Sequence, residues 1–207
     1  MSDRTVDQKS VVAFGSKDRG LVRSVYFIHR VILGEDMPKG LKQTSSQIVI
    51  SSLISETGAN TFTERQIDLQ LNVLDREVFV VTAVDLDPQL PDAQAGLDTA
   101  TEGSLSSTSR ATIGFISDTN VIAASTLGIR AAGFVDGGVG FQQAHPDTPA
   151  GSDMDYVAII ATNDFFLQVQ GVANVGAKNM SARVWGYRAV ADAATFAALT
   201  QSELLSA

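Results

Sequence analysis

The sequence contains no cysteine, and this single absence excludes several kinds of chemistry. Without a thiol the chain can form no disulfide bond, offer no thiolate to a zinc ion and use no cysteine nucleophile. Histidine is nearly as scarce: only His29 and His145 occur, so a zinc site would have to be built almost wholly from carboxylates. Stability must therefore come from packing, within the chain or against neighbouring subunits.

Catalytic motifs are missing as well. The chain has no Gly-x-Ser-x-Gly elbow and no Walker A loop, and the glycines between residues 128 and 140 do not fit the dinucleotide-binding pattern. His29 lies in an apolar run and His145 precedes a proline, which favours structural roles for both. A glycosidase binds sugar in a cleft lined with aromatic residues, and this chain has a single tryptophan to contribute to one. We therefore predict a protein that is not an enzyme and uses no cofactor.

Long apolar runs are absent too. No run approaches the roughly 18 residues that a membrane-spanning helix needs. The first nine residues are mostly polar, and no apolar segment with a cleavage site follows them. We therefore expect neither a transmembrane segment nor a secretory signal.

Charge is unevenly distributed along the chain, whose net charge is −8. Residues 1–45 hold eight Lys/Arg against five Asp/Glu, whereas the remainder holds seven against eighteen. A mildly basic segment ahead of an acidic body indicates that the two parts face different surroundings. The basic residues are scattered and no aromatic residues interleave with them, so we predict no sequence-specific binding of nucleic acid.

Alternation of apolar and polar residues is the strongest pattern in the chain. Ile67, Leu69 and Leu71 alternate with polar residues, as in a strand buried on one face, and residues 77–86 form a denser β-branched run. Similar runs recur at the spacing typical of a sandwich or barrel. The predicted strands are 24–33, 47–55, 61–73, 77–86, 111–117, 120–125, 155–162, 164–173 and 182–190. This pattern predicts an all-β, antiparallel β-sandwich of about eight or nine strands.

The segments between the strands complete this organisation. The polar break at residues 74–76 predicts an antiparallel hairpin between the strands on either side of it. Residues 87–110 and 128–153 exceed the usual loop length of about 12–15 residues, and loops that long tend to be functional or interfacial. The predicted core includes Ile67, Leu69, Leu71, Val78, Val80, Ile159, Leu167 and Val169.

We divide the chain into three parts. Residues 1–23 alternate poorly and mix charges, so we expect an N-terminal arm rather than a core strand. Residues 24–190 are expected to form the β-sandwich domain. Residues 191–207 are expected to form a short C-terminal helix with Asp192 as its N-cap.

Carboxylates are the remaining candidates for metal binding. Asp85 with Asp87, and Asp153 with Asp155, place acids two residues apart near strand ends, and calcium favours clustered loop oxygens. Neither pair belongs to a twelve-residue loop that ends in Glu, and surface acids at strand ends are common. These four residues are therefore weak calcium candidates, and we assign no metal.

A group of interface-forming residue types lies at residues 183–188. Alternation places Arg183, Trp185 and Tyr187 on one face of a strand, and these are the residue types most enriched at binding hot spots. A lone tryptophan in a sandwich more often fills the core. We therefore assign Trp185 to the core and keep Arg183 and Tyr187 as candidate interface residues.

The chain resembles the single jelly-roll coat proteins of icosahedral viruses. The resemblance lies in a mildly basic N-terminal segment, strands with long loops between them, and the absence of cysteine and of catalytic motifs. The resemblance covers residues 24–190, in which runs such as 77–86 and 182–190 fit as strands. It implies two facing four-stranded sheets and a self-assembling capsid subunit located in the virion. It also implies homo-oligomer contacts through the sandwich edges and the N-terminal arm.

The arm is far less basic than in coat proteins that package RNA directly. The resemblance therefore implies a shell that encloses its genome indirectly, around an internal membrane or beside other capsid proteins. The alternative is a non-catalytic β-sandwich that binds a ligand or glycan, lectin-like or receptor-binding, with or without calcium, through residues 87–110 and 128–153.

Overall fold

The computed structural model describes residues 38–133, 140–144 and 155–205. The chain divides into a first unit, residues 1–36, and a second, residues 37–207, and every described residue belongs to the second. The predicted arm, the predicted strand at 24–33, and His29, His145 and Asp153 lie outside the described residues.

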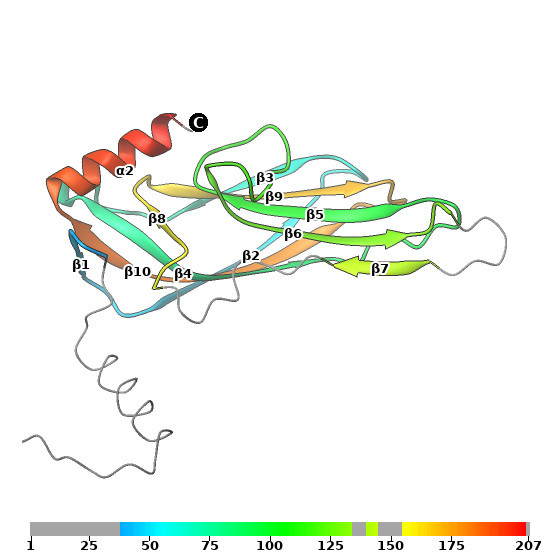
Figure 1. Cartoon of the computed structure of the whole chain (residues 1–207), viewed down its shortest axis with the longest axis horizontal. Helices are drawn as coiled ribbons and strands as arrows, with labels where there is room; N and C mark the ends of the chain where they lie inside the picture. The colour runs from blue at the N-terminus through cyan, green and yellow to red at the C-terminus, as the bar shows by residue number, and fades with distance from the viewer. Residues whose placement is uncertain (1–37, 134–139, 145–154, 206–207) are drawn as a thin grey trace, which may run out of the picture. The chain divides into compact units, whose positions relative to one another are not determined.

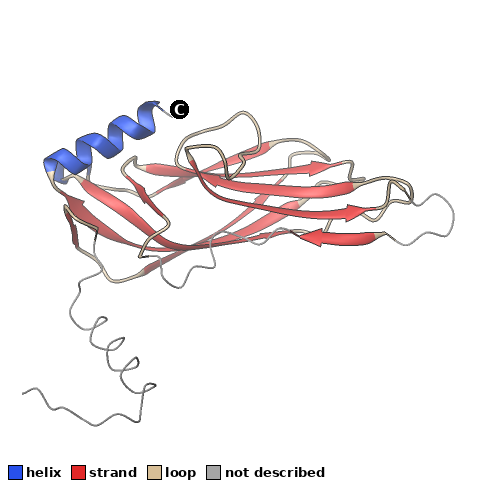
Figure 2. Cartoon of the chain, in the orientation of Figure 1, coloured by secondary structure: helices blue, strands red, loops and turns tan. Residues whose placement is uncertain are grey.

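The second unit contains two antiparallel sheets and one helix (Figure 2). The first sheet, which we call sheet A, has β10 and β4 at its centre. β4 pairs with β10 on one side and β8 on the other, while β2 and β1 pair with successive parts of β10 along its remaining edge. Its strands are β1 (Leu41–Gln43), β2 (Ile48–Ser55), β4 (Glu77–Pro88), β8 (Ala158–Ile160) and β10 (Asn179–Ala191).

The second sheet, sheet B, has the strand order β3-β9-β5-β6-β7. All of its neighbouring strands are antiparallel. Its strands are β3 (Thr63–Asp68), β5 (Thr99–Ser106), β6 (Val121–Arg130), β7 (Phe141–Ala144) and β9 (Asp164–Val172). Figure 1 shows sheet B lying across sheet A, and both sheets contribute side chains to the main core.

Alternation explains the core between the sheets. In β10, Met180, Ala182 and Val184 point inward and are buried, and in sheet B Leu105 and Leu167 meet them from the opposite side. Of the eight residues predicted as core, six are buried, and Ile67 and Ile159 are partly buried and packed against core clusters. The predicted antiparallel sandwich is confirmed.

Helix α2 (Ala193–Leu205) packs on the outer face of sheet A (Figure 1). Its Phe196 and Leu199 pack against a second cluster that includes Val78 and Val80 of β4. The Asp192 carboxylate accepts a hydrogen bond from the Thr195 backbone N–H at 2.7 Å, so the predicted N-cap is confirmed.

The predicted hairpin at residues 74–76 is wrong. β3 pairs with β9 in sheet B, whereas β4 pairs with β10 and β8 in sheet A. The break is instead a crossover between the sheets, and it contains the short 3-10 helix Val73–Asp75. Leu69 and Leu71 lie beyond the end of β3 and remain buried. Alternation reports which face of a strand is buried, but it carries no information about which strand pairs with it.

Two other expectations about the long segments are corrected. The predicted loop 87–110 contains β5, a central strand of sheet B, and the predicted loop 128–153 contains β7. The predicted strand 111–117 is part of a connection with no regular structure, residues 107–120. β5 reads TATEGSLS, which lacks large β-branched side chains. Five of its last six residues are nevertheless buried, and four of these five are small or polar: Thr101, Gly103, Ser104 and Ser106. Its neighbours β6 and β9 pair with it on both sides.

Candidate functional surfaces

The outer face of sheet A carries two of the predicted calcium ligands. Asp85 and Asp87 are exposed on β4, and across the ladder from them on β10 lie Arg183 and Ser181. These side chains line an open depression of about 480 Å³ together with residues of β2. Its lining residues are Ser51, Ser52, Leu53, Asp85, Asp87, Ser181, Ala182 and Arg183. The depression combines carboxylates, hydroxyls and one guanidinium.

The structure describes three of the four calcium candidates, Asp85, Asp87 and Asp155. Asp155 is exposed at the start of the segment that leads into β8, and it is not among the residues that line the Asp85 depression. Within residues 38–133, 140–144 and 155–205, no three His, Asp or Glu side chains are grouped as a metal site would require. The calcium site stays a prediction.

The position of Trp185 corrects its assignment to the core. Because Val184 points inward, Trp185 points to the outer face of sheet A, where it is half-buried. The Arg183 guanidinium lies over its ring, 5.7 Å from the centroid, in a cation–π arrangement. The next residue, Gly186, packs closely against β4, because a Cβ added to it would lie 2.4 Å from the Val80 carbonyl oxygen.

Tyr187 lies on the same outer face, where α2 covers the sheet. It is partly buried and packs against the cluster beneath the helix. Burial, and then the nearby charge of Asp155, raise the pKa of its hydroxyl. Arg183 is exposed and Tyr187 is partly covered, and their role as interface residues stays a prediction.

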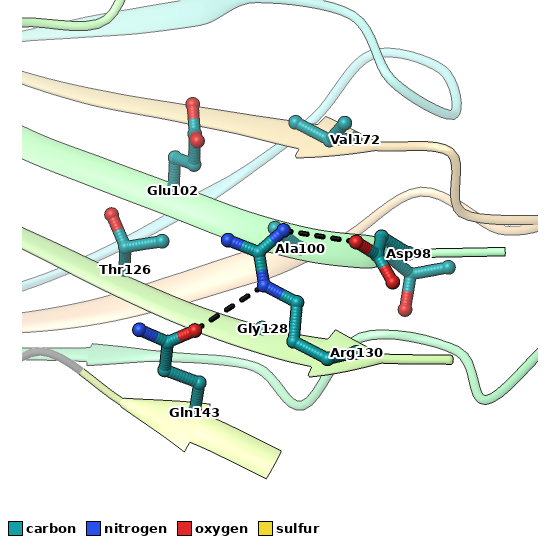
Figure 3. Close-up of a pocket in the computed structure, with 9 residues that line it drawn as sticks. Asp98, Ala100, Glu102, Thr126, Gly128, Arg130, Gln143 and Val172 are labelled. Atoms are coloured by element: carbon teal, nitrogen blue, oxygen red, sulfur yellow. Dashed lines mark hydrogen bonds and ion pairs between the residues drawn. The ribbon is translucent and has the colours of Figure 1, made fainter. Parts of the chain in front are cut away.

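A pocket of about 180 Å³ lies on the outer face of sheet B (Figure 3). Arg130 of β6 reaches across its floor, donating to Asp98 at 2.9 Å and to Gln143 of β7 at 3.2 Å. The Ala132 N–H, followed by the Arg130 guanidinium, lowers the pKa of the Asp98 carboxyl. Burial raises the pKa of Glu102, which stands on β5 in the same pocket. The pocket thus holds an ion pair and a carboxyl of reduced acidity.

A hydrogen-bonded network holds the connection 107–120 over the other part of this face. The buried Gln168 amide accepts from Ser104 at 2.8 Å and donates to Ser106 and to Glu64. The Glu64 carboxylate also accepts the Arg110 backbone N–H at 2.8 Å. Every polar atom of the Gln168 side chain is therefore paired, which makes a polar residue with no solvent exposure tolerable in this position.

The end of the sandwich next to the β9–β10 turn is also tied together by polar groups. The buried Glu56 carboxylate accepts the backbone N–H groups of Gly171 and Lys178 at 2.6 and 2.7 Å. The Lys178 ammonium, whose side chain is 5% exposed, pairs with Asp92 at 2.6 Å. The Asp92 carboxylate also accepts two backbone N–H groups of the turn. The buried charges of Glu56 and Lys178 are therefore paired within the fold, where they stabilise this end of the sandwich.

The sequence patterns did not indicate these networks. Glu64, Gln168, Asp98 and Arg130 carry no motif, and their partners are far away along the chain. The turn-forming residues 118–120 were the one local signal that could have indicated a tight turn after the segment 111–117.

Strand order defines the class of the fold. Leaving aside the short β1 and β7, the strands β2, β3, β4, β5, β6, β8, β9 and β10 form two facing sheets of four, ordered β2-β10-β4-β8 and β3-β9-β5-β6. The first strand therefore lies beside the last, and the chain wraps between the sheets as in a jelly roll. This is a jelly-roll β-sandwich with one short strand added to each sheet. No helix among the described residues is long and apolar enough to cross a membrane.

The structural likenesses of this chain to known proteins include the following two. One is to a chain in the three-dimensional structure of Cocksfoot mottle virus, with 10% identity and a TM-score of 0.31 over 92% of this chain and 96% of that one. Another is to the tailspike protein gp49 of Acinetobacter baumannii bacteriophage Fri1, a capsular polysaccharide depolymerase, with 8% identity and a TM-score of 0.15 over 86% of this chain and 23% of that one. No protein-family model and no curated protein matches the sequence.

Proposed function

We propose that this protein is a non-enzymatic, self-assembling coat subunit of a virion shell. The observation that carries the proposal is the jelly-roll strand order, since double-sheet jelly rolls recur in viral capsid and lectin domains. In such a subunit the rigid sandwich provides the wall and the connections at its ends provide the contacts with other copies.

The free edges of the two sheets support assembly of limited, specific extent. The edge strands β8, β7 and β3 are short, with three, four and six residues. At the longer edge strand β2, Arg65 of β3 donates to the Leu53 carbonyl oxygen at 2.7 Å. Short or capped edges resist open-ended strand pairing, which leaves specific side-chain contacts to determine how copies associate.

The arm provides the test of the proposal. Apolar side chains in residues 1–23, such as Val11, Phe14 and Leu21, would gain about 25 cal/mol per Å² if a neighbouring subunit buried them. Deleting residues 2–23 should leave the far-ultraviolet circular dichroism of the sandwich intact and weaken assembly in sedimentation and negative-stain microscopy. Added salt should weaken assembly of the full chain only modestly, because the basic segment offers few charge contacts to screen.

The outcomes are distinct. Shells or stable multimers of the full chain, weakened by the deletion, support the coat subunit with an assembling arm. Assembly that the deletion leaves unchanged removes the arm from the proposal, and unfolding of the deleted chain would make the arm a core strand. A full chain that remains monomeric at every concentration contradicts the proposal. An internal membrane or other capsid proteins would be the partners of such a shell.

The Asp98–Arg130 pocket favours one second candidate, a glycan-binding module. Its paired Asp98 and Arg130, the Gln143 amide and the Glu102 carboxyl offer donors and acceptors in one small cavity, as sugar hydroxyls require. A glycan array probed with the intact protein and with Arg130→Ala tests it. Binding by a monomer that Arg130→Ala abolishes would support the glycan-binding module, and the absence of any bound glycan would contradict it.

A further inference from the structure

Two large apolar side chains project from the connection between β5 and β6. Phe115 is 62% exposed and Ile116 is 70% exposed, while their neighbour Ile113 is buried at 6% and anchors the segment to the sandwich. Adjacent exposed apolar side chains on a soluble protein commonly mark an interaction site. We call Phe115 and Ile116 the apolar tip.

The apolar tip is held in place by hydrogen bonds. The Arg110 guanidinium binds the Asp118 carboxylate and the Asn120 side chain, each at 2.6 Å. Asp118 in turn accepts the Phe115 backbone N–H at 3.1 Å and donates its own N–H to the Phe115 carbonyl oxygen at 2.9 Å. Because the tip is already ordered, little conformational entropy remains to be lost when a partner binds it.

An apolar hollow of about 320 Å³ lies at the opposite end of β6. Leu90 and Phe141 at its border are 53% and 57% exposed, so the hollow offers uncovered apolar surface. Among the residues that the structure describes, no charged side chain is part of its lining, which consists of Leu90, Ala93, Gln94, Ala95, Ile129, Ala131, Gly140, Phe141 and Gln142.

A chain cannot place its own tip in its own hollow. The tip lies before β6 begins at Val121, whereas Ile129 and Ala131 of the hollow lie at the far end of that strand. Ten strand residues span roughly 30 Å at about 3.3 Å per residue. A contact between these two surfaces therefore joins two copies head to tail, in the arrangement that forms rings when it closes.

Charge favours this pair of surfaces over the rest of the molecule. Each chain has a net charge of −8, so most surfaces of two copies repel one another. The described part of the hollow's lining contains no charged side chain, and at the tip the charges of Arg110 and Asp118 are paired with each other. We propose that the apolar tip of one copy inserts into the apolar hollow of the next copy, an inference that rests on the proposed coat function and identifies one of its contacts.

The first test replaces the tip. Phe115→Ser with Ile116→Ser should keep the fold and raise the dissociation constant of assembly by about tenfold or more, as expected for hot-spot side chains. Leu74→Ser is the matched control, because Leu74 is 94% exposed and belongs to neither surface. Sedimentation of both variants beside the unaltered chain gives the readout.

The second test is disulfide cross-linking. Because the chain contains no cysteine, any disulfide that forms must involve the introduced cysteines. Ile116→Cys combined with Phe141→Cys should form disulfide-linked dimers and higher multimers under mild oxidation. Ile116→Cys alone and Ile116→Cys with Leu74→Cys are the controls and should cross-link far less.

Each result decides between the two proposals. If the unaltered chain assembles and the serine variant assembles equally well, the tip-to-hollow contact is wrong and the coat proposal stands. If Ile116→Cys alone cross-links as efficiently as the pair, two tips meet each other and the inference is overturned. If the unaltered chain never assembles, the coat proposal fails and the inference fails with it.

Discussion

The buried carboxylate of Glu203 should make the docking of α2 sensitive to pH. Glu203 is 8% exposed, and its Oε1 accepts the Ala161 backbone N–H at 3.0 Å. Burial raises the pKa of this carboxyl, outweighing the hydrogen bonds from Ala161 and Thr162 that lower it, and the charge of Asp164 adds a small increase. The folded protein therefore holds the proton more tightly than the unfolded chain does.

The sign of the effect follows from that difference in pKa. The stabilising contribution is complete below the ordinary carboxyl pKa of about 4.3 and is lost as the pH rises through the raised pKa of the folded state. Above that raised pKa the folded protein carries a buried carboxylate charge, and a buried polar group that is incompletely hydrogen-bonded costs about 1–3 kcal/mol. Glu203→Gln keeps the acceptor for Ala161 and removes the charge, so it should raise the free energy of unfolding at pH 8 by about 1–2 kcal/mol.

Urea unfolding at pH 5 and pH 8, in dilute protein so that assembly does not contribute, provides the measurement. Glu203→Gln should flatten the decline in stability between these pH values. Glu203→Ala should lower stability at both, because the Ala161 N–H then loses its acceptor. A Glu203→Gln variant that is less stable than the unaltered chain at pH 8, or that keeps the same pH dependence, would refute the reasoning.

Three further predictions concern the sandwich and its helix. Leu69→Ala should lower the free energy of unfolding by about 2–5 kcal/mol, because the side chain loses its burial and leaves a cavity. Leu74→Ala, at an exposed position, should change the urea midpoint little. Equal midpoints for the two variants would show that Leu69 is not a core residue. Gly186→Ala should lower the free energy of unfolding by about 1–3 kcal/mol, because its Cβ would lie 2.4 Å from a carbonyl oxygen of β4. Gly176→Ala, where a Cβ would meet open space, should be nearly neutral in the same assay. The Thr195 N–H lowers the pKa of the Asp192 carboxyl, so the cap is lost as the pH falls from the ordinary aspartate pKa through the lowered one. The protection of the α2 amides against hydrogen exchange, taken relative to the intrinsic rate at each pH, should fall over that range, and Asp192→Asn should abolish this dependence.

Local patterns predicted the strands that large apolar residues dominate. β4 and β10 were located because β-branched or alternating side chains give a signal within a few residues, and α2 because Asp192 marks its start. β5 escaped prediction because its interior positions are filled by Thr101, Gly103 and Ser104, which resemble a loop in composition.

The pairing of strands and the candidate surfaces depend on contacts between distant residues. The Glu64–Gln168 bond joins residues 104 positions apart, and no window of sequence contains both partners. Trp185 was misplaced because a lone tryptophan indicates a core on average, whereas the alternation fixed by Val184 directs it outward. The exposure of Phe115 and Ile116 follows from a turn whose bonds become visible only once the sheet is assembled.

The position of β10 has a consequence for how the protein matures during its synthesis. Although β10 is the last strand in the sequence, it lies between β2 and β4 and pairs with both along most of its length. Until about residue 191 has left the ribosome, β2 and β4 each lack their principal partner. The nascent chain then exposes unpaired strands and the apolar side chains that β10 covers in the folded protein. Folding of sheet A must therefore wait for the synthesis of β10, and a copy truncated before β10 should be retained by chaperones or degraded and so be kept out of any assembly.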